Sequence, residues 1–96
     1  MATLTVMARI SPKPEHLDDA RKAIEEILKP TRSEPGCHRF DLFTGNSDGC
    51  LYLFEEWDND EALEQHYAQP YTAKVFALYQ DWLAHPVEVH RMTKAT

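Results

Sequence analysis

The segment 51–54, Leu-Tyr-Leu-Phe, most constrains what this chain can fold into, because it carries large apolar side chains on both faces of a predicted strand. That strand spans 50–57 and follows a strand at 37–44 across the turn residues of 45–49, which predicts a hairpin. A sheet with one solvated face alternates apolar and polar residues, and the helices of one chain cover only one face. We therefore expect a second layer on the other face, most simply the same sheet of a second copy.

Strands and helices alternate along the chain. The predicted elements are strands at 3–10, 37–44, 50–57 and 87–93, an amphipathic helix at 14–29, and helical stretches before and after Pro70. Pro30 is expected to end or kink the first helix, since proline has no backbone N–H. The order β-α-β-β-α-β predicts an α+β, ferredoxin-like fold, an antiparallel sheet with helices on one face, in a single domain spanning 1–96.

The charge balance restricts the partners. Sixteen acidic residues outnumber ten basic ones, for a net charge of −6. An acidic surface repels phosphate backbones and anionic lipid, so we expect neither nucleic acid nor a membrane as a partner. Neither end carries a long apolar run, so we expect no transmembrane segment or secretory signal and a cytoplasmic location. Two cysteines make no disulfide framework and are expected to be thiols.

The sequence lacks the common cofactor and metal motifs. It contains no CxxC, GxGxxG, P-loop or HExxH, which disfavours structural zinc and the familiar nucleotide-binding loops. The histidines show no metal-ligand spacing; they are His16, His38, His66, His85 and His90. We therefore predict no metal and no cofactor.

Several short motifs occur together in an ordered set. They are Glu34-Pro35-Gly36-Cys37, Arg39-Phe40, Glu55-Glu56-Trp57, Glu61-Ala62-Leu63 and His66. With their strand and helix placement, which covers 4–90, they resemble the antibiotic biosynthesis monooxygenase family. The resemblance implies a dimeric α+β barrel, in which two sheets pack face to face, and an apolar pocket between sheet and helices. The family includes cofactor-free quinol oxygenases and the phospho-autoinducer-2 isomerase, and haem-degrading enzymes are related, so the reaction stays open.

Two residues are candidates for catalysis. His66 is the first choice of base, because the ordinary pKa of histidine lies near neutrality and His66 lies on the apolar stripe of its helix, facing the sheet. It could equally be a buried histidine held by a hydrogen bond. Glu55 shares a strand face with the apolar residues and must be paired if that face meets the helices. Its partner could be His66, which would become more basic, or an arginine among Arg9, Arg39 and Arg91.

Aromatic residues could line or fill the pocket. The candidates are Phe40, Trp57, Tyr67, Tyr71, Phe76 and Tyr79. Trp57 could stack on an aromatic substrate, and the hydroxyls of Tyr67 and Tyr71 could donate to a substrate oxygen or make dimer contacts. Cys37 shares a strand face with Arg39 by simple alternation, and nothing around it indicates a nucleophilic thiol.

The first hypothesis is a cofactor-independent monooxygenase that oxidises a quinol-like or polyketide-like aromatic with O₂. An isomerase of a small phosphorylated sugar is the alternative, and it needs Arg32 or Arg39 to point into the pocket. A third hypothesis is a dimer that binds a small ligand without turnover. In the haem-degrading relatives a helix histidine such as His66 is the axial ligand, but their Asn and Trp partners are not evident in this sequence.

Overall fold

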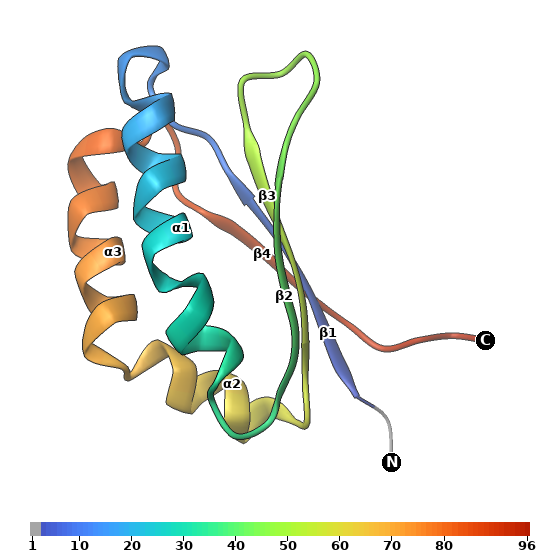
Figure 1. Cartoon of the computed structure of the whole chain (residues 1–96). Coiled ribbons are helices and arrows are strands. Elements are labelled where there is room, and N and C mark those ends of the chain that lie inside the picture. The colour runs from blue at the N-terminus through green and yellow to red at the C-terminus, as the bar shows by residue number, and fades with distance from the viewer. Residues whose placement is uncertain (1–2) are drawn as a thin grey trace.

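A computed structural model describes residues 3–96 and contains one antiparallel sheet with its helices packed on one side (Figure 1). The elements are β1 (Leu4–Ile10), a 3-10 turn (Pro14–His16), α1 (Leu17–Arg32), β2 (Cys37–Thr44), β3 (Leu51–Trp57), α2 (Asp60–Tyr67), α3 (Pro70–Trp82) and β4 (Glu88–Met92). The strand order is β2-β3-β1-β4, which confirms the predicted α+β, ferredoxin-like fold. No helix in residues 3–96 combines the length and apolarity needed to cross a membrane.

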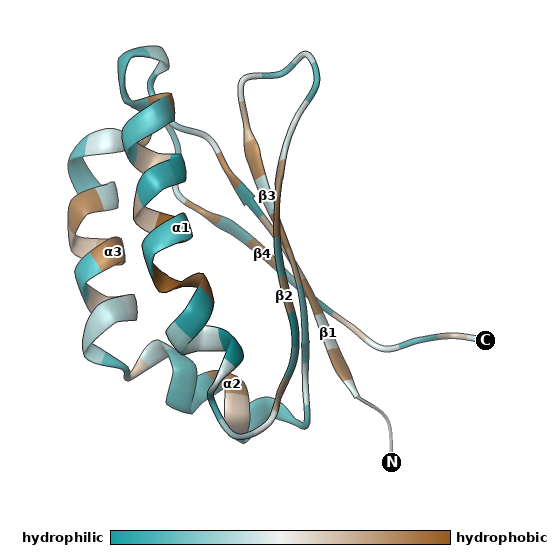
Figure 2. Ribbon diagram, viewed as in Figure 1, coloured by the Kyte–Doolittle hydropathy of each residue, from teal (hydrophilic) through white to brown (hydrophobic). Residues whose placement is uncertain are grey.

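The core lies between the sheet and the helices. In β3 every second side chain is buried, from Leu51 to Trp57, because these side chains point to one face and the helices cover that face. Figure 2 shows apolar residues recurring along the strands, while the helices alternate between apolar and polar residues. The helix side of the sheet also carries Glu55, opposite Val6 on β1 and Phe40 on β2. A carboxyl group therefore lies in the middle of the apolar layer.

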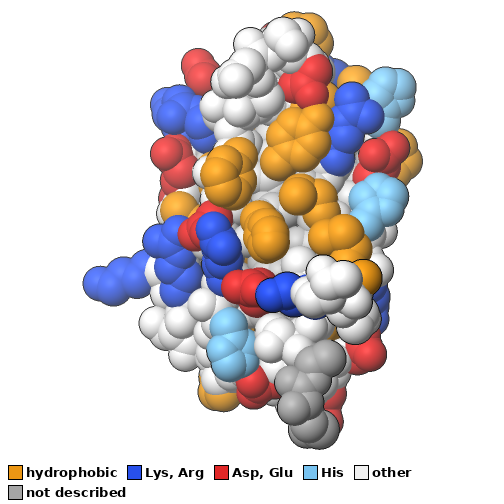
Figure 3. Space-filling view, turned by 90° about the vertical axis from the view of Figure 1, so that its right-hand side faces the viewer, with side chains coloured by type: hydrophobic (Ala, Val, Ile, Leu, Met, Phe, Trp, Pro, Cys, Tyr) orange, Lys and Arg blue, Asp and Glu red, His pale blue; other side chains and the backbone are white. Residues whose placement is uncertain are grey.

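Within residues 3–96, no helix covers the other face of the sheet (Figure 1). Met7 lies opposite Phe54, and Phe43 lies opposite Tyr52, so four large side chains form two adjacent cross-strand pairs. Figure 3 shows apolar side chains gathered in the middle of this face with charged groups around them. Phe43 is 50% exposed. We call Met7, Phe43, Tyr52 and Phe54 the outer apolar patch.

The first helix continues through Pro30, so the expectation that it ends there is wrong, while the alternative of a kink stays a prediction. α1 extends to Arg32. Its last turn is held by tertiary contacts: Thr31 is fully buried, and Arg32 Nε donates to the Phe40 carbonyl at 3.0 Å. Proline has no backbone N–H, so Pro30 leaves one helical hydrogen bond unmade on the exposed side of α1, and these contacts offset that loss.

A β-bulge at the start of β2 overturns the expected orientation of Cys37. Cys37 lies opposite Trp57 and Arg39 opposite Glu56, so one extra residue, His38, stands between two successive pairs. Cys37 therefore belongs to the helix side of the sheet and packs against the core, whereas Arg39 belongs to the outer face. Simple alternation assigns both to one face because it cannot anticipate the bulge.

Candidate active site

His66 lies on the buried side of α2. Asn59 is the N-cap residue of this helix: its side chain accepts a hydrogen bond from the Ala62 backbone N–H at 2.9 Å and so caps the first turn. Ala62, Leu63 and His66 then repeat at helical spacing and are all buried. His66 is only 4% exposed.

The imidazole of His66 is fixed by one carboxylate and by aromatic rings. Its Nδ1 lies 2.8 Å from Oε2 of Glu34. Its ring centroid is 4.9 Å from that of Trp57 and 5.5 Å from that of Phe40. A hydrogen bond at one ring nitrogen determines which tautomer the neutral ring adopts. With Nδ1 bound to the carboxylate, Nε2 is the atom left to accept a proton.

Glu34 comes from the turn between α1 and β2, and that turn is held against α2. Gly36 has φ +88°, and a Cβ at this position would lie 2.9 Å from the Cβ of Ala62. The Gly36 carbonyl also accepts from the Asp58 N–H at 2.8 Å. The side chain of Glu34 is 8% exposed. The Glu-Pro-Gly turn therefore places a carboxylate inside the protein.

Tyr71 at the start of α3 is a second partner of Glu34. Its hydroxyl donates to the same Oε2 that contacts His66. Burial and the hydrogen bond to this carboxylate raise the pKa of Tyr71 well above its usual range, so the phenol stays protonated and donates. Glu34 thus joins α2 and α3 at one oxygen atom. The sequence offers one signal for Glu34, its place in the motif Glu34-Pro35-Gly36-Cys37.

Glu55 is buried as expected, at 4% exposure, but its partner is different from those expected. Trp57 Nε1 donates to Oε1 of Glu55 at 2.9 Å, so the pair with His66 is not formed. Burial is the main cause that raises the pKa of Glu55 to about 7; the Trp57 hydrogen bond opposes this rise, and the nearby Glu34 carboxylate adds to it. Near neutral pH this carboxyl group is therefore present in both protonation states.

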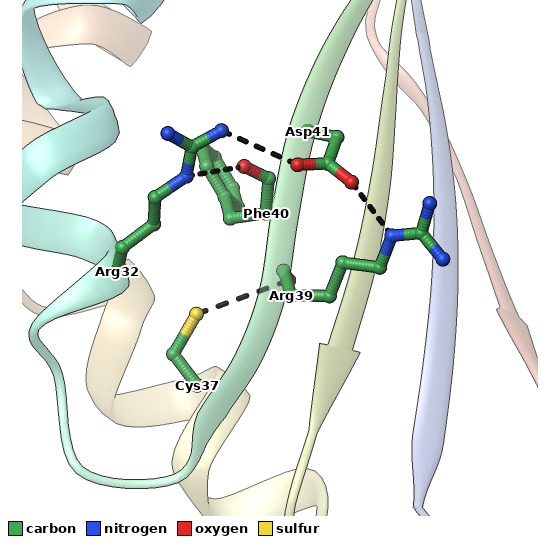
Figure 4. A network of polar contacts seen from close by, with 5 residues as sticks. All are labelled: Arg32, Cys37, Arg39, Phe40 and Asp41. Carbon is green, nitrogen blue, oxygen red and sulfur yellow. Dashed lines mark hydrogen bonds and ion pairs between the residues drawn. The ribbon is translucent and has the colours of Figure 1, made fainter.

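The arginines named as alternative partners of Glu55 bind other carboxylates. Arg9 lies 3.9 Å from Glu88; Arg91 donates to Asp60 and Glu64; Arg39 donates to Asp41. Figure 4 shows the last of these groups on the β2 edge, where Asp41 lies between the guanidinium groups of Arg32 and Arg39. Neither Arg32 nor Arg39 lines the internal cavity described next.

A narrow apolar cavity lies between the sheet and the helices beside these groups. Its volume is about 40 Å³, which at roughly 10–15 Å³ each holds about three water molecules. Glu55 and His66 both line it, as do four of the expected aromatic residues. These are Phe40, Tyr67, Phe76 and Tyr79. The lining residues, all within the described part of the chain, include no lysine or arginine.

Two residues expected in the pocket do not line it. Trp57 is fully buried behind the cavity, where its ring packs on His66 and its N–H holds Glu55. The hydroxyl of Tyr71 donates to Glu34, the carboxylate that is bonded to His66. Both positions act on the groups that line the cavity, because each is a hydrogen-bond donor to a carboxylate beside His66. Sequence spacing predicts which strand or helix carries each residue, but not the direction in which its N–H or O–H group points.

The remaining histidines and thiols lie outside the cavity. His16 pairs with Asp19, and His38 pairs with Asp58, both on the surface. Within residues 3–96 no group of three or more His, Cys, Asp or Glu side chains is arranged to hold a metal ion. Burial raises the pKa of Cys37 to about 11, so this thiol is a poor nucleophile near neutral pH.

The chain belongs to the antibiotic biosynthesis monooxygenase family. The family model matches residues 3–78, which include Glu34, Glu55 and His66.

Two relatives show how far the likeness extends. A Mycobacterium tuberculosis protein named "Putative monooxygenase Rv0793" is 33% identical over 86 residues, which is 90% of this chain and 85% of the relative. Its solved structure superposes with a TM-score of 0.92, covering 98% of this chain and 96% of that one at 30% identity. The Pseudomonas aeruginosa protein PA3566 superposes with a TM-score of 0.93 at 25% identity and covers 100% of this chain and 97% of its own.

A solved structure described as an antibiotic biosynthesis monooxygenase has a TM-score of 0.90 at 30% identity, with coverage of 97% of this chain and 99% of that one. Fold and family are thereby established, and they point to a monooxygenase activity. The relatives' names do not give a substrate.

Proposed function

We propose that this protein is a cofactor-independent monooxygenase that oxidises a quinol-like or polyketide-like aromatic with O₂ in the cavity beside His66. The observation that carries the proposal is the buried Glu34–His66 pair at the wall of an apolar cavity. A cavity without charged donors suits a flat apolar substrate, and the histidine supplies the base that such a substrate needs. Free thiols at Cys37 and Cys50 agree with the proposed cytoplasmic location.

In the proposed first step, Nε2 of His66 takes the proton of a substrate hydroxyl. Glu34 holds Nδ1–H and stabilises the imidazolium that forms, as the carboxylate does in a catalytic triad. The aromatic anion is electron-rich and transfers an electron directly to O₂, so the substrate supplies every electron of the reaction. The radical pair then recombines at a ring carbon to give a peroxide.

The overall reaction balances without a further reductant. A hydroquinone with a free ring position reacts with one O₂; one oxygen atom enters the ring, the other leaves as water, and the product is the hydroxyquinone. The ring carbon loses its hydrogen as the peroxide O–O bond breaks, and that proton and the one held by His66 enter the water. Atoms and charge are conserved, and His66 returns to its neutral form.

Glu55 is proposed to act as a hydrogen-bond donor in its protonated form. With a pKa of about 7, a substantial fraction of this carboxyl group carries a proton near neutral pH. A neutral carboxyl group can donate to the developing oxyanion of the substrate. Trp57 holds Oε1, which leaves Oε2 for the substrate.

The cavity is too small for such a substrate unless side chains move. Phe76 is 41% exposed, so it reaches both the cavity and the surface. It also borders a larger open groove between α3 and β4, which shares Tyr79, Val87 and Val89 with the cavity wall. Rotation of the Phe76 ring is the simplest way to open the cavity to the substrate, because an exposed aromatic side chain meets few packing constraints.

The isomerase alternative is less well supported. A phosphorylated sugar needs cationic or multiple polar donors for its phosphate, and Arg32 and Arg39 point away from the cavity into the network around Asp41. Among the described residues, no lysine or arginine lines the cavity. The non-catalytic hypothesis differs from the proposed function only in turnover, so the assay below separates the two.

The enzyme is proposed to be a homodimer that joins its sheets. The outer apolar patch is the supporting feature, since no helix or strand of the described chain packs over Met7, Phe43, Tyr52 and Phe54. Apolar surface of this kind is stabilised by removal from water. A second copy related by a two-fold axis presents the same patch to itself.

The proposal is tested by O₂ consumption with a panel of hydroquinones and anthrones, after subtraction of the rate without protein. The wild type is expected to consume O₂ with at least one substrate, and His66→Ala to lose this activity while keeping the oligomeric state. His16→Ala is the matched control, because His16 also pairs with a carboxylate but lies on the surface. Equal activity of wild type and His66→Ala would remove the assignment of the base. Binding without O₂ consumption would favour the non-catalytic hypothesis.

A further inference from the structure

The cavity contains a buried polar group that no residue satisfies. Thr72 lines the cavity and is 3% exposed, and its hydroxyl oxygen is among the buried polar atoms without a hydrogen-bond partner in the described part of the chain. Three neighbouring polar side chains have partners: Glu55 accepts from Trp57, His66 is bonded to Glu34, and the Tyr79 hydroxyl donates to the Ala20 carbonyl. Buried polar atoms are normally paired, so an exception calls for an explanation.

The secondary structure around Thr72 does not supply one. Thr72 lies in the first turn of α3, after Gln69 and Pro70. A threonine inside a helix often bonds to the carbonyl four residues earlier, and Thr72 does not. Leaving the hydroxyl unpaired destabilises the folded protein, and a valine of the same shape would avoid this cost. The cavity beside it has room for about three water molecules, so a water molecule can bond to this hydroxyl, and a ligand that enters the cavity can take the place of that water.

We propose that the Thr72 hydroxyl binds an oxygen atom of the substrate and so selects aromatic ligands that carry a phenol or carbonyl oxygen. The proposal rests on the proposed function for the class of ligand, an aromatic held in this cavity. A hydroxyl donates to a carbonyl and accepts from a phenol by rotation about its Cβ–Oγ bond, so one residue serves both the quinol and the quinone. A ligand with a methyl group in place of the oxygen leaves Thr72 unpaired.

Thr72 and His66 then have different tasks. His66 removes a proton from a substrate hydroxyl. Thr72 positions the aromatic ring by bonding either to that hydroxyl oxygen or to a second oxygen atom of the substrate. Both lie on the helix side of the cavity, from α3 and α2, and Glu55 faces them from β3. A polar site that rejects ligands lacking the matching oxygen gives stronger discrimination than an apolar site gives by shape alone.

The test compares two ligands of one shape, 1-naphthol and 1-methylnaphthalene, by isothermal titration calorimetry. The wild type is expected to prefer 1-naphthol. Thr72→Val should lower that preference about tenfold by weakening the binding of 1-naphthol alone, whereas Thr72→Ser, which keeps the hydroxyl, should retain it. Thr31→Val is the control: Thr31 is also a buried threonine but does not line the cavity, and its replacement should leave the preference unchanged.

A melting curve of each variant without ligand excludes a folding defect. Thr72→Val is expected to melt at the wild-type temperature or above, because it removes an unpaired buried hydroxyl. A more stable variant that discriminates less cannot be explained by a structural role. Thr72→Val with undiminished preference for 1-naphthol overturns the inference and leaves the proposed function intact. Failure of the wild type to bind 1-naphthol also overturns the inference, and the O₂-consumption assay then decides separately on the proposed function.

Discussion

Replacement of Glu55 by glutamine should remove a pH dependence from the stability of this protein. Glu55 is a carboxyl group in the middle of the sheet's buried face, and burial raises its pKa from an ordinary 4.5 to about 7. The folded protein therefore keeps this proton through a range of pH in which the unfolded chain has lost it. The stabilising contribution is complete below about 4.5 and is lost as the pH rises through about 7.

The size of the effect follows from the two pKa values. A difference of 2.5 pH units between 4.5 and about 7, at about 1.4 kcal/mol per unit, corresponds to about 3 kcal/mol of unfolding free energy. Glutamine keeps the carbonyl oxygen that accepts from Trp57 and has no titrating group. The free energy of the wild type minus that of Glu55→Gln should therefore fall by about 3 kcal/mol between roughly pH 4.5 and pH 8.

Urea unfolding at a fixed protein concentration measures this difference, and a fixed concentration is needed because the proposed dimer makes stability depend on it. Glu26→Gln, on the exposed side of α1, is the matched control and should change the pH dependence by less than about 1 kcal/mol. A wild-type-minus-variant difference that stays constant across the pH range would refute the reasoning. It would mean that the buried carboxyl group is satisfied equally in both protonation states.

Three further predictions concern the turn, the thiol and the outer face. Gly36→Ala should destabilise the protein by about 3 kcal/mol, because the added methyl group clashes with α2 and the residue also has a strained positive φ. Gly49 has a positive φ but open space around it, so Gly49→Ala should cost only about 1 kcal/mol. Urea unfolding measures both costs, and equal values would contradict the predicted clash at Gly36. In a Cys50→Ser background, Cys37 should react slowly with a disulfide reagent near neutral pH, because its thiol is almost fully protonated there. The reaction rate should rise about tenfold per pH unit up to about pH 11, and a rate that levels off near pH 8 would contradict this prediction. Phe54→Glu should convert the proposed dimer into a monomer, as measured by sedimentation velocity, because it places a charge in the outer apolar patch. A charge reversal on the exposed side of α1 should leave the mass unchanged. A Phe54→Glu variant with an unchanged mass would show that the outer apolar patch is not the interface.

The fold could be predicted from the sequence because local patterns determine it. Alternation along β1 and β3 and the helical spacing of 14–29 identify the elements, and their order restricts the topology to few choices. Two errors arose where tertiary contacts override local rules. The last turn of α1 continues past Pro30 because Arg32 bonds to β2, and a bulge moves Cys37 to the other face.

The site was predictable in its residue types more than in its contacts. His66 and Glu55 both line one cavity, and their helical and strand faces follow from periodicity. Their partners do not, because Glu34 and His66 are separated by 32 positions in sequence and meet only when the turn before β2 packs on α2. Thr72 gave no sequence signal at all, since an orphaned hydroxyl is defined by what surrounds it.

The central claim is that this chain oxidises an aromatic with O₂ directly, with His66 at the cavity and Glu34 bonded to His66. The most direct measurement is turnover of a hydroquinone under oxygen-18 gas, with protein treated with a chelator and shown by absorbance to carry no flavin or haem. The expected result is one labelled oxygen atom in each product molecule from the wild type, and loss of the labelled product in His66→Ala and Glu34→Gln. An unlabelled product, or a labelled product formed equally by these variants, would contradict the claim.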